Sequence, residues 1–204
     1  MEEINLIKIC QSGHIAAFEL LLKRYEHKAM QTAYLITRQR ELAEDIVQEA
    51  FIQCYNQLHT LRQPEYFRTW FYRILIRLSY KMVKKEKWKS FFLQKSVLDI
   101  GYTPQFDQKV VAKEMYGALY DSVNNLSEKL RAVVVLYYFN EMTTKEMADV
   151  LAISEGTVKS RLHHARKRIQ ETLLDKGYVS WEALGGGEQA YVGNAIAENA
   201  DWSG

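Results

Sequence analysis

The residues best suited to specific chemistry are the hydrogen-bonding and basic side chains between positions 157 and 167. At helical spacing they lie opposite an apolar stripe formed by Val158, Leu162, Ala165 and Ile169, so one helix presents them together. Such side chains pair with base edges in the major groove of DNA, where each well-made pair contributes roughly 1–3 kcal/mol of discrimination. The alternative is a basic face that meets only solvent. The candidate DNA contacts are Thr157, Lys159, Ser160, Arg161, His163, His164 and Lys167.

Catalytic chemistry has little support in the residue pattern. The five histidines show no metal-ligand spacing such as H-E-x-x-H, and neither Cys10 nor Cys54 has the basic or helix-start context that activates a thiol. The three glycines at 185–187 lack the Lys-Ser/Thr pair that completes a phosphate-binding loop. We therefore predict no catalytic residue, no metal site, no cofactor and no small-molecule substrate.

The helix that carries the candidate DNA contacts is predicted to be the second helix of a helix-turn-helix. Thr143 and Glu146 have the spacing of a capping box, which starts a short amphipathic helix. A tight turn at Ala152 follows, and Ser154 is placed to cap the basic helix. Ala152 stands where glycine would adopt a left-handed backbone without steric cost, so we expect strain of about 1 kcal/mol in the turn.

A second basic region lies on the helix predicted to start at Phe67. Between positions 68 and 95 the chain carries nine Lys or Arg residues against one acidic residue, Glu86. Cations interleaved with an aromatic ring suit a DNA strand with unstacked bases, because each base stacked on a ring contributes roughly 1–3 kcal/mol. Trp70 borders both the apolar and the basic side of this helix, so packing in the core is an equal alternative for it. The candidate DNA contacts here are Trp70, Arg73, Arg77, Tyr80 and Lys84.

The helix predicted from Glu44 carries a different kind of surface. Its apolar residues, from Ile46 through Tyr55 to Leu58, recur at helical spacing and are predicted to face the core. The opposite side carries polar and acidic residues around one isoleucine. An apolar anchor with a charged rim is typical of a protein contact, and the alternative is an ordinary exposed helix face. The candidate protein contacts are Asp45, Gln48, Glu49 and Ile52.

The whole chain is predicted to be all-α. Its 204 residues include only two prolines, which disfavours a β-sandwich or barrel with many obligatory turns. We expect two small helical domains, 1–88 and 114–176, joined by a flexible linker at 89–113; the second is expected to be a helix-turn-helix domain with a winged-helix-like four-helix fold. A tail at 177–204 holds four acidic and no basic residues and is expected to be flexible.

The sequence carries no signal for export or membrane insertion. The N-terminus, Met1-Glu2-Glu3, lacks the basic start of a signal peptide, and the longest apolar run, at 132–139, has eight residues. A membrane-spanning helix needs about 20. Two distant cysteines do not make a disulfide scaffold. We predict a cytoplasmic protein that is not membrane-embedded.

The two helical blocks together resemble one known family. Residues 126–131, 146–148 and 153–162 resemble the domain of extracytoplasmic-function sigma factors that recognises the promoter minus-thirty-five element. Residues 43–51 and 70–74 are similar to the family's other domain. The resemblance implies a factor that binds core RNA polymerase and directs promoter-specific transcription initiation. It also implies a response to stress or envelope signals and control by an anti-sigma factor.

The resemblance further implies a role for each surface. The side of the helix around Ile52 would bind the clamp coiled coil of the largest polymerase subunit. The helix from Phe67 and the loop before it, at 59–65, would recognise and open the minus-ten element, with one base flipped into a pocket. Arg77 and Lys81 occupy positions where many members carry Asn and Asp, so no minus-ten sequence preference is predicted.

Two alternatives for the function of the chain remain open from the sequence. The chain could be a stand-alone helix-turn-helix regulator that binds operators without polymerase, or an adaptor that does not bind DNA. The first domain, with one face suited to DNA and one suited to protein, argues against a simple regulator. For the tail we consider a weak fold-back onto a basic face, against a plain solvated tail.

Overall fold

The computed structural model describes residues 2–93 and 110–178, and in these ranges every regular element is a helix. The prediction of an all-α fold is confirmed. The first domain comprises α1 (Glu3–Gln11), α2 (Ile15–Thr37), α3 (Arg40–Gln57), the short η1 (Leu58–Thr60) and η2 (Pro64–Tyr66), and α4 (Phe67–Leu93). The second domain comprises α5 (Val110–Asn124), α6 (Glu128–Val134), η3 (Val135–Phe139), α7 (Thr144–Leu151) and α8 (Glu155–Asp175).

The helices extend into both ends of the predicted linker. α4 continues past the predicted boundary at 88 to Leu93, and α5 begins at Val110, ahead of 114. Pro64 opens η2 directly before α4, at a position where its missing N–H costs no helical hydrogen bond. The rest of the linker, 94–109, and the tail from 179 onward lie outside the described residues.

An aromatic cluster joins α2, α3 and α4 in the first domain. The ring of Tyr25 meets those of Phe67 and Phe71 edge-on, at 5.2 and 5.5 Å between centroids, and Phe51 stacks on Phe71 at 5.0 Å. Most residues of the predicted inward faces of these helices are buried, and a few at the margins, such as Phe18 and Trp70, are half-buried. Tyr55 was predicted to face the core but is 51% exposed, because the apolar stripe of α3 is wider than the side that its neighbours cover.

The second domain packs α5, α6 and α8 around its own apolar core. Val123, Val134, Tyr138, Ile169 and Leu173 are almost fully buried in it. The predicted four-helix arrangement, α5 to α8, is present, and the described part of the domain contains no strand that could form a wing. The predicted cap and turn residues set the angle between α7 and α8, which positions the basic helix.

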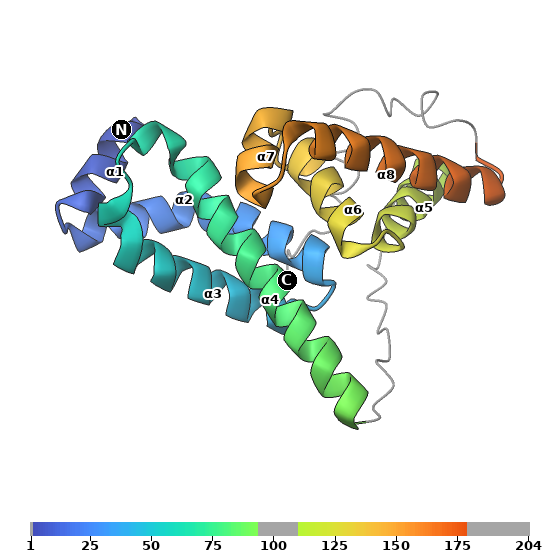
Figure 1. Cartoon of the computed structure of the whole chain (residues 1–204), viewed down its shortest axis with the longest axis horizontal. Helices are drawn as coiled ribbons and strands as arrows, with labels where there is room; N and C mark the ends of the chain where they lie inside the picture. The colour runs from blue at the N-terminus through green and yellow to red at the C-terminus, as the bar shows by residue number, and fades with distance from the viewer. Residues whose placement is uncertain (1, 94–109, 179–204) are drawn as a thin grey trace.

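The two domains pack against each other rather than standing apart. α7 lies against α4, while α6 and η3 lie against α2 (Figure 1). One continuous core cluster joins buried side chains of α2, α3 and α4 with those of the second domain, among them Val133, Leu136, Met147 and Val150. The side of α4 that faces α7 is therefore covered by the chain's own second domain.

Candidate nucleic-acid and polymerase interfaces

The basic helix α8 begins at a well-formed N-cap. Ser154 Oγ accepts a hydrogen bond from the backbone N–H of Thr157 at 3.1 Å. In α7 the predicted capping box is present: Thr143 Oγ1 accepts from the Glu146 N–H at 3.2 Å, and Glu146 Oε2 accepts from the Thr143 N–H at 2.8 Å. Ala152 has φ 52°, the left-handed conformation expected there. These local contacts confirm the predicted helix-turn-helix.

Most of the candidate DNA contacts on α8 lie on its exposed side. Thr157 and Arg161 are half-buried at the edges, and the predicted apolar stripe is buried behind them. Arg166 donates through Nε to the Tyr138 hydroxyl at 2.8 Å, so this arginine is held within its own domain. The exposed residues form a continuous row, called the α8 row below: Lys159, Ser160, His163, His164 and Lys167.

Two lysines of the α8 row each lie near a glutamate one turn away, and both lysine side chains are well exposed. Lys159 pairs with Glu155 at 2.8 Å, and Lys167 lies 4.0 Å from Glu171. Hydrogen bonding to Lys159 lowers the pKa of Glu155. Exposed pairs of this kind contribute little to stability, because water screens them. Both lysines are therefore oriented outward and can exchange their partners for phosphates.

On α4 the candidate residues do not form one exposed row. Arg73 Nε donates to the backbone carbonyl of Asp149 in α7 at 2.9 Å. Arg77 donates to Gln53 Oε1 of α3 at 3.2 Å. The two arginines are thus engaged by different neighbours, while Lys84 is exposed.

The two aromatic candidates of α4 are partly buried. The hydroxyl of Tyr80 is buried without a hydrogen-bond partner. Burial raises the pKa of this phenol to about 12, and the nearby guanidinium of Arg161 in α8 opposes the shift. Trp70 is half-buried and packs on Phe67 with centroids 6.0 Å apart, which agrees with its predicted position between core and surface.

The loop at 59–65 is braced by α1, which sequence reasoning did not anticipate. Gln11 Nε2 donates to the backbone carbonyls of Leu58 at 3.0 Å and Leu61 at 2.7 Å. This one amide group ties both ends of η1 to the N-terminal helix. No sequence signal indicates the contact, since the partners lie 47 and 50 residues away.

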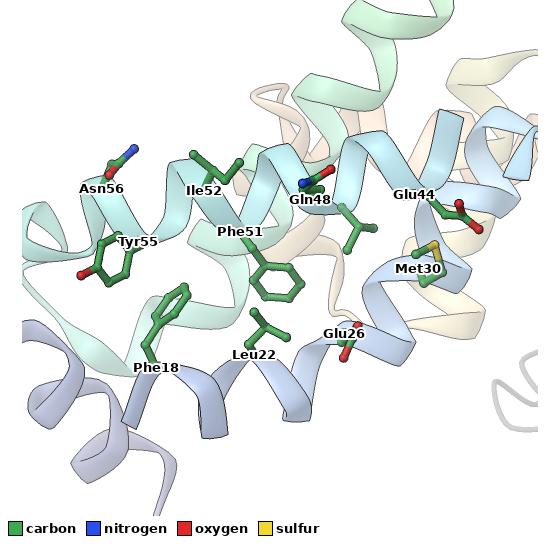
Figure 2. A pocket seen from close by; sticks show the side chains of 11 residues that line it. Phe18, Leu22, Glu26, Met30, Glu44, Gln48, Phe51, Ile52, Tyr55 and Asn56 are labelled. Carbon is green, nitrogen blue, oxygen red and sulfur yellow. The ribbon is translucent and has the colours of Figure 1, made fainter. Parts of the chain in front are cut away.

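The candidate protein contacts on α3 border an apolar groove between α2 and α3 (Figure 2). Gln48 and Ile52 line it, and Ile52 is 49% exposed. Asp45 is exposed and Glu49 half-buried, but neither lines the groove. The groove has a volume of about 470 Å³, and its other lining residues are Phe18, Leu22, Glu26, Met30, Glu44, Val47, Phe51, Tyr55 and Asn56.

The sequence of α2 carries a signal for this groove. Phe18 and Leu22 recur at a spacing of four on α2, beside the residues that face the core. The ring of Phe18 meets that of Tyr55 edge-on at 5.1 Å, so the two helices present a joint apolar surface. Glu26 and Glu44 lie at one end of it, which gives the groove an acidic border.

Among 2–93 and 110–178, no three His, Cys, Asp or Glu side chains gather closely enough to hold a metal ion. In the same ranges no helix has the length and apolar character needed to cross a membrane.

Comparison with known proteins identifies the family. Residues 21–89 match the family model described as Sigma-70 region 2, and residues 116–169 match that described as Sigma-70, region 4. The chain is 30% identical over 179 residues to the ECF RNA polymerase sigma factor SigW of Bacillus subtilis, covering 83% of this chain and 95% of that protein. It is 27% identical over 182 residues to the ECF RNA polymerase sigma-E factor of Haemophilus influenzae, covering 82% and 93%.

Two solved structures share the fold. CnrH, in complex with the cytosolic domain of CnrY, aligns with a TM-score of 0.62 and 23% identity over 85% of this chain and 97% of that one. The sigma factor RpoE of Bartonella quintana, in complex with the anti-sigma factor NepR, aligns with a TM-score of 0.66 and 19% identity over 78% and 98%.

Fold, family models and relatives agree on one class of protein, the bacterial initiation factors of the sigma-70 type. Within that class the chain belongs to the extracytoplasmic-function sigma factors. It is a factor that binds core RNA polymerase and directs promoter-specific transcription initiation. The predicted family is confirmed, and the two alternatives without polymerase are set aside.

Proposed function

We propose that each of the three surfaces binds a different partner during initiation. The groove between α2 and α3, which includes Gln48 and Ile52, binds the clamp coiled coil of polymerase together with Asp45 and Glu49 beside it. The face of α4 and the loop at 59–65 bind and open the minus-ten element. The α8 row, with Thr157 and Arg161 at its edges, binds the minus-thirty-five element. The protein acts in the cytoplasm as a specificity factor and catalyses no reaction itself.

The α8 row is the observation that carries the proposal. It offers hydrogen-bond donors and acceptors on one helix face while the opposite face is buried, as a major-groove helix requires. The pairing of Lys159 and Lys167 with glutamates extends both side chains along the exposed surface. Base contacts from the centre of the row give discrimination, and the cations at its edges orient the helix on the phosphates.

The groove supports the polymerase contact by its shape and chemistry. It is apolar, exposed and bounded by acidic side chains, so it fits a helix that carries apolar anchors flanked by basic residues. Ile52 and Tyr55 are both about half exposed. This exposure contributes nothing to the packing of their own domain. Large apolar side chains in such a position contribute most of the binding energy when a partner covers them.

An anti-sigma factor is the further partner that we propose. The Bartonella sigma factor was solved with one, and CnrH with the cytosolic domain of CnrY, on the same fold. The exposed apolar groove is also the surface that such a partner would cover, since masking it separates the factor from polymerase.

Reconstituted transcription from a randomised promoter library tests the proposal. With core polymerase the chain should select two conserved blocks spaced as a minus-ten and a minus-thirty-five element. Ile52→Glu should weaken polymerase binding roughly 30-fold, because a carboxylate must be desolvated in the groove. Leu174→Glu, at a residue that is 53% exposed on α8, is the matched control. Selection of only one block, or equal binding by both variants, would contradict the assignments.

A further inference from the structure

The N-terminal end of α8 carries an acidic residue that has no role in the α8 row. Glu155 is the first residue of the helix, one turn before Lys159. The other acidic residues of α8, Glu171 and Asp175, lie in its last two turns. In a helix-turn-helix the N-terminal residues of the second helix contact base edges in the major groove. Glu155 therefore lies at the end of α8 that enters the groove.

Two neighbouring side chains hold the carboxylate of Glu155 in place. Its Oε1 accepts a hydrogen bond from Thr144 Oγ1 of α7 at 2.7 Å and lies 2.8 Å from Lys159 Nζ. Hydrogen bonding to Lys159, and then to Thr144, lowers the pKa of Glu155, so the carboxylate stays ionised at neutral pH. The side chain thus presents a negative charge in a defined position beside the basic row.

The cap of α8 does not depend on this carboxylate. Ser154 supplies the cap by accepting from the Thr157 N–H at 3.1 Å. An acidic residue in the first turn also interacts favourably with the helix dipole. A structural role of that kind would be the same on every DNA sequence, so base preference separates it from a role in recognition.

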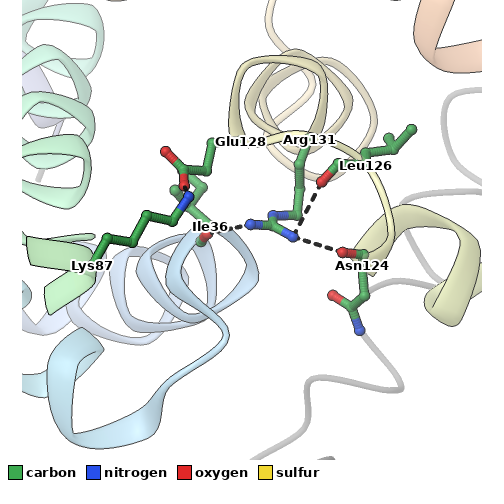
Figure 3. Close-up of polar contacts among 6 residues, drawn as sticks. All are labelled: Ile36, Lys87, Asn124, Leu126, Glu128 and Arg131. Atoms are coloured by element: carbon green, nitrogen blue, oxygen red, sulfur yellow. Dashed lines mark hydrogen bonds and ion pairs between the residues drawn. The ribbon is translucent and has the colours of Figure 1, made fainter. Parts of the chain in front are cut away.

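The second domain is anchored to the first through α6, and this end of α8 remains accessible. Arg131 in α6 is 5% exposed and donates to the carbonyl of Ile36 at 3.0 Å, in the last turn of α2 (Figure 3). It also donates to the carbonyl of Asn124 at 2.8 Å in its own domain. A cation at a helix C-terminus satisfies carbonyls that the helix leaves unpaired. The side chains of Glu155 and Lys159, in contrast, are 43% and 64% exposed.

A carboxylate in the major groove discriminates among the bases by their hydrogen-bonding groups. An ionised carboxylate only accepts hydrogen bonds, and the donors in the groove are the exocyclic amino groups of cytosine and adenine. The exocyclic oxygens of guanine and thymine are acceptors, which repel it. Acidic side chains typically pair with the N4 amino group of cytosine.

DNA binding makes this discrimination stronger at Glu155. Lys159 can leave the carboxylate for a phosphate, because an exposed ion pair contributes little to stability. The carboxylate then keeps the Thr144 hydroxyl but lies near the negative DNA backbone. A base that donates a hydrogen bond compensates for the lost cation. A base that presents an acceptor leaves the charge unpaired, which weakens binding.

We propose that Glu155 is a specificity-determining residue that accepts a hydrogen bond from the N4 amino group of one cytosine in the minus-thirty-five element, and that Thr144 positions it. The inference rests on the proposed role of α8 in binding that element. Guanine and thymine are rejected at this position by repulsion. Adenine, which also presents an amino group, is rejected less strongly.

Base enrichment in the randomised promoter library tests the proposal. With core polymerase, the parent chain should enrich cytosine at one position of the minus-thirty-five block, on one of the two strands. Glu155→Gln should shift that position toward adenine by roughly 10-fold, because an amide pairs with both N6 and N7 of adenine. Glu155→Ala should leave the position without a preference. The other positions of the block should keep theirs.

Glu171→Gln is the matched control. This glutamate also lies near a lysine of the α8 row, 4.0 Å from Lys167, but in the C-terminal half of the helix. Its library profile should equal that of the parent. An unchanged profile for Glu155→Gln, or an equal loss of preference at every position of the block, would overturn the inference and leave the proposed function intact. Absence of a minus-thirty-five block from the parent selection would instead overturn the function on which the inference rests.

Binding of the polymerase complex to one selected promoter tests the contact directly. A pyrimidine that lacks the exocyclic amino group replaces the selected cytosine. Affinity should fall roughly 10-fold for the parent chain and should not change for Glu155→Ala. An equal loss for both chains would show that the amino group does not pair with Glu155, and the inference would be wrong.

The positioning role of Thr144 has its own test. Thr144→Val removes the hydroxyl that holds the carboxylate and should lower the preference for cytosine roughly 3-fold. Thr172→Val is the control, because its hydroxyl donates to the carbonyl of Arg168 at 2.9 Å within α8. Equal preferences in the two variants would overturn the assignment of Thr144.

Discussion

Helices α4 and α8 have similar residue patterns, but their basic faces differ in exposure in the structure. Each combines an apolar stripe with basic residues at helical spacing. The α8 row is exposed along its length, whereas the corresponding residues of α4 are divided among α3, α7 and solvent. A basic face at helical spacing therefore indicates which side of a helix avoids its own core. It does not indicate whether another domain covers that side.

The difference has a physical origin in the apolar pattern of α4. Phe71 and Leu75 fill the core with α2 and α3, but Tyr72 and Ile76, on a neighbouring side, are buried as well. A helix buried on more than one side has partners beyond its local bundle. On α8 the buried residues follow one stripe, so its outer side remains free of the second domain's own packing.

The largest effect is expected on α8. Combined substitution of Lys159, Ser160 and His163 by Ala should lower transcription from a selected promoter by roughly 100-fold or more, since each lost base pairing costs about 1–3 kcal/mol. Lys176→Ala, beyond the end of the same helix, serves as the control because its exposed pair with Asp121 contributes little. If the triple variant retained full activity, the α8 row would not be the promoter contact and the contrast with α4 would disappear.

On α4 the expected effect concerns stability at high pH. The folded state raises the pKa of Tyr80 to about 12, whereas an unfolded tyrosine titrates near 10. Between these values the unfolded chain loses the proton first, so stability should fall as pH rises, by up to about 3 kcal/mol in total. Tyr80→Phe should lack this part of the decline.

Urea unfolding of both chains from about pH 9 to 12 measures the difference, and other buried tyrosines contribute equally to the two. At neutral pH Tyr80→Phe should be as stable as the parent or gain up to about 1 kcal/mol, because it removes a buried hydroxyl that has no partner. Identical pH profiles would show that Tyr80 is solvent-exposed in solution and that α4 resembles α8 after all.

A smaller effect is expected from the contacts that fix the segments before α4 and α8. The loop before α4 depends on Gln11, whereas the turn before α8 is capped by Ser154 three residues from its partner. Gln11→Leu should reduce discrimination among minus-ten sequences roughly 5-fold, because the loop loses two partly buried hydrogen bonds. Selectivity for minus-thirty-five sequences should stay unchanged. Ser12→Ala, which removes only a local bond to Ile9, is the comparison. Equal loss at both promoter elements would point to general destabilisation instead.

The smallest effect is expected in the turn of the helix-turn-helix. Ala152→Gly should stabilise the chain by roughly 0.5–1 kcal/mol, because glycine adopts the left-handed conformation without steric cost and this gain exceeds its entropy penalty. Thermal unfolding measures the change. DNA binding by α8 should be unaffected, and a lower melting temperature would show that the alanine is not strained.

Local features of the site could be predicted from the sequence because their partners are close along the chain. The capping box spans Thr143 to Glu146, the cap of α8 spans Ser154 to Thr157, and the strain at Ala152 follows from its place between two helices. Tyr55 was misplaced because helical periodicity cannot tell how wide a stripe the neighbours cover. Gln11 was missed because an amide side chain carries no sign of a partner 47 residues away.

The sequence by itself determined the helices, their caps, the apolar stripes and the exposed basic face of α8, since all of these arise from contacts within a few residues. Only the tertiary structure decided that α6 and α7 cover α4, that Arg131 closes the end of α2, and that Phe18 and Tyr55 form one groove. Those contacts join residues far apart in sequence. Their formation depends on how whole helices pack, which no local pattern of residue types encodes.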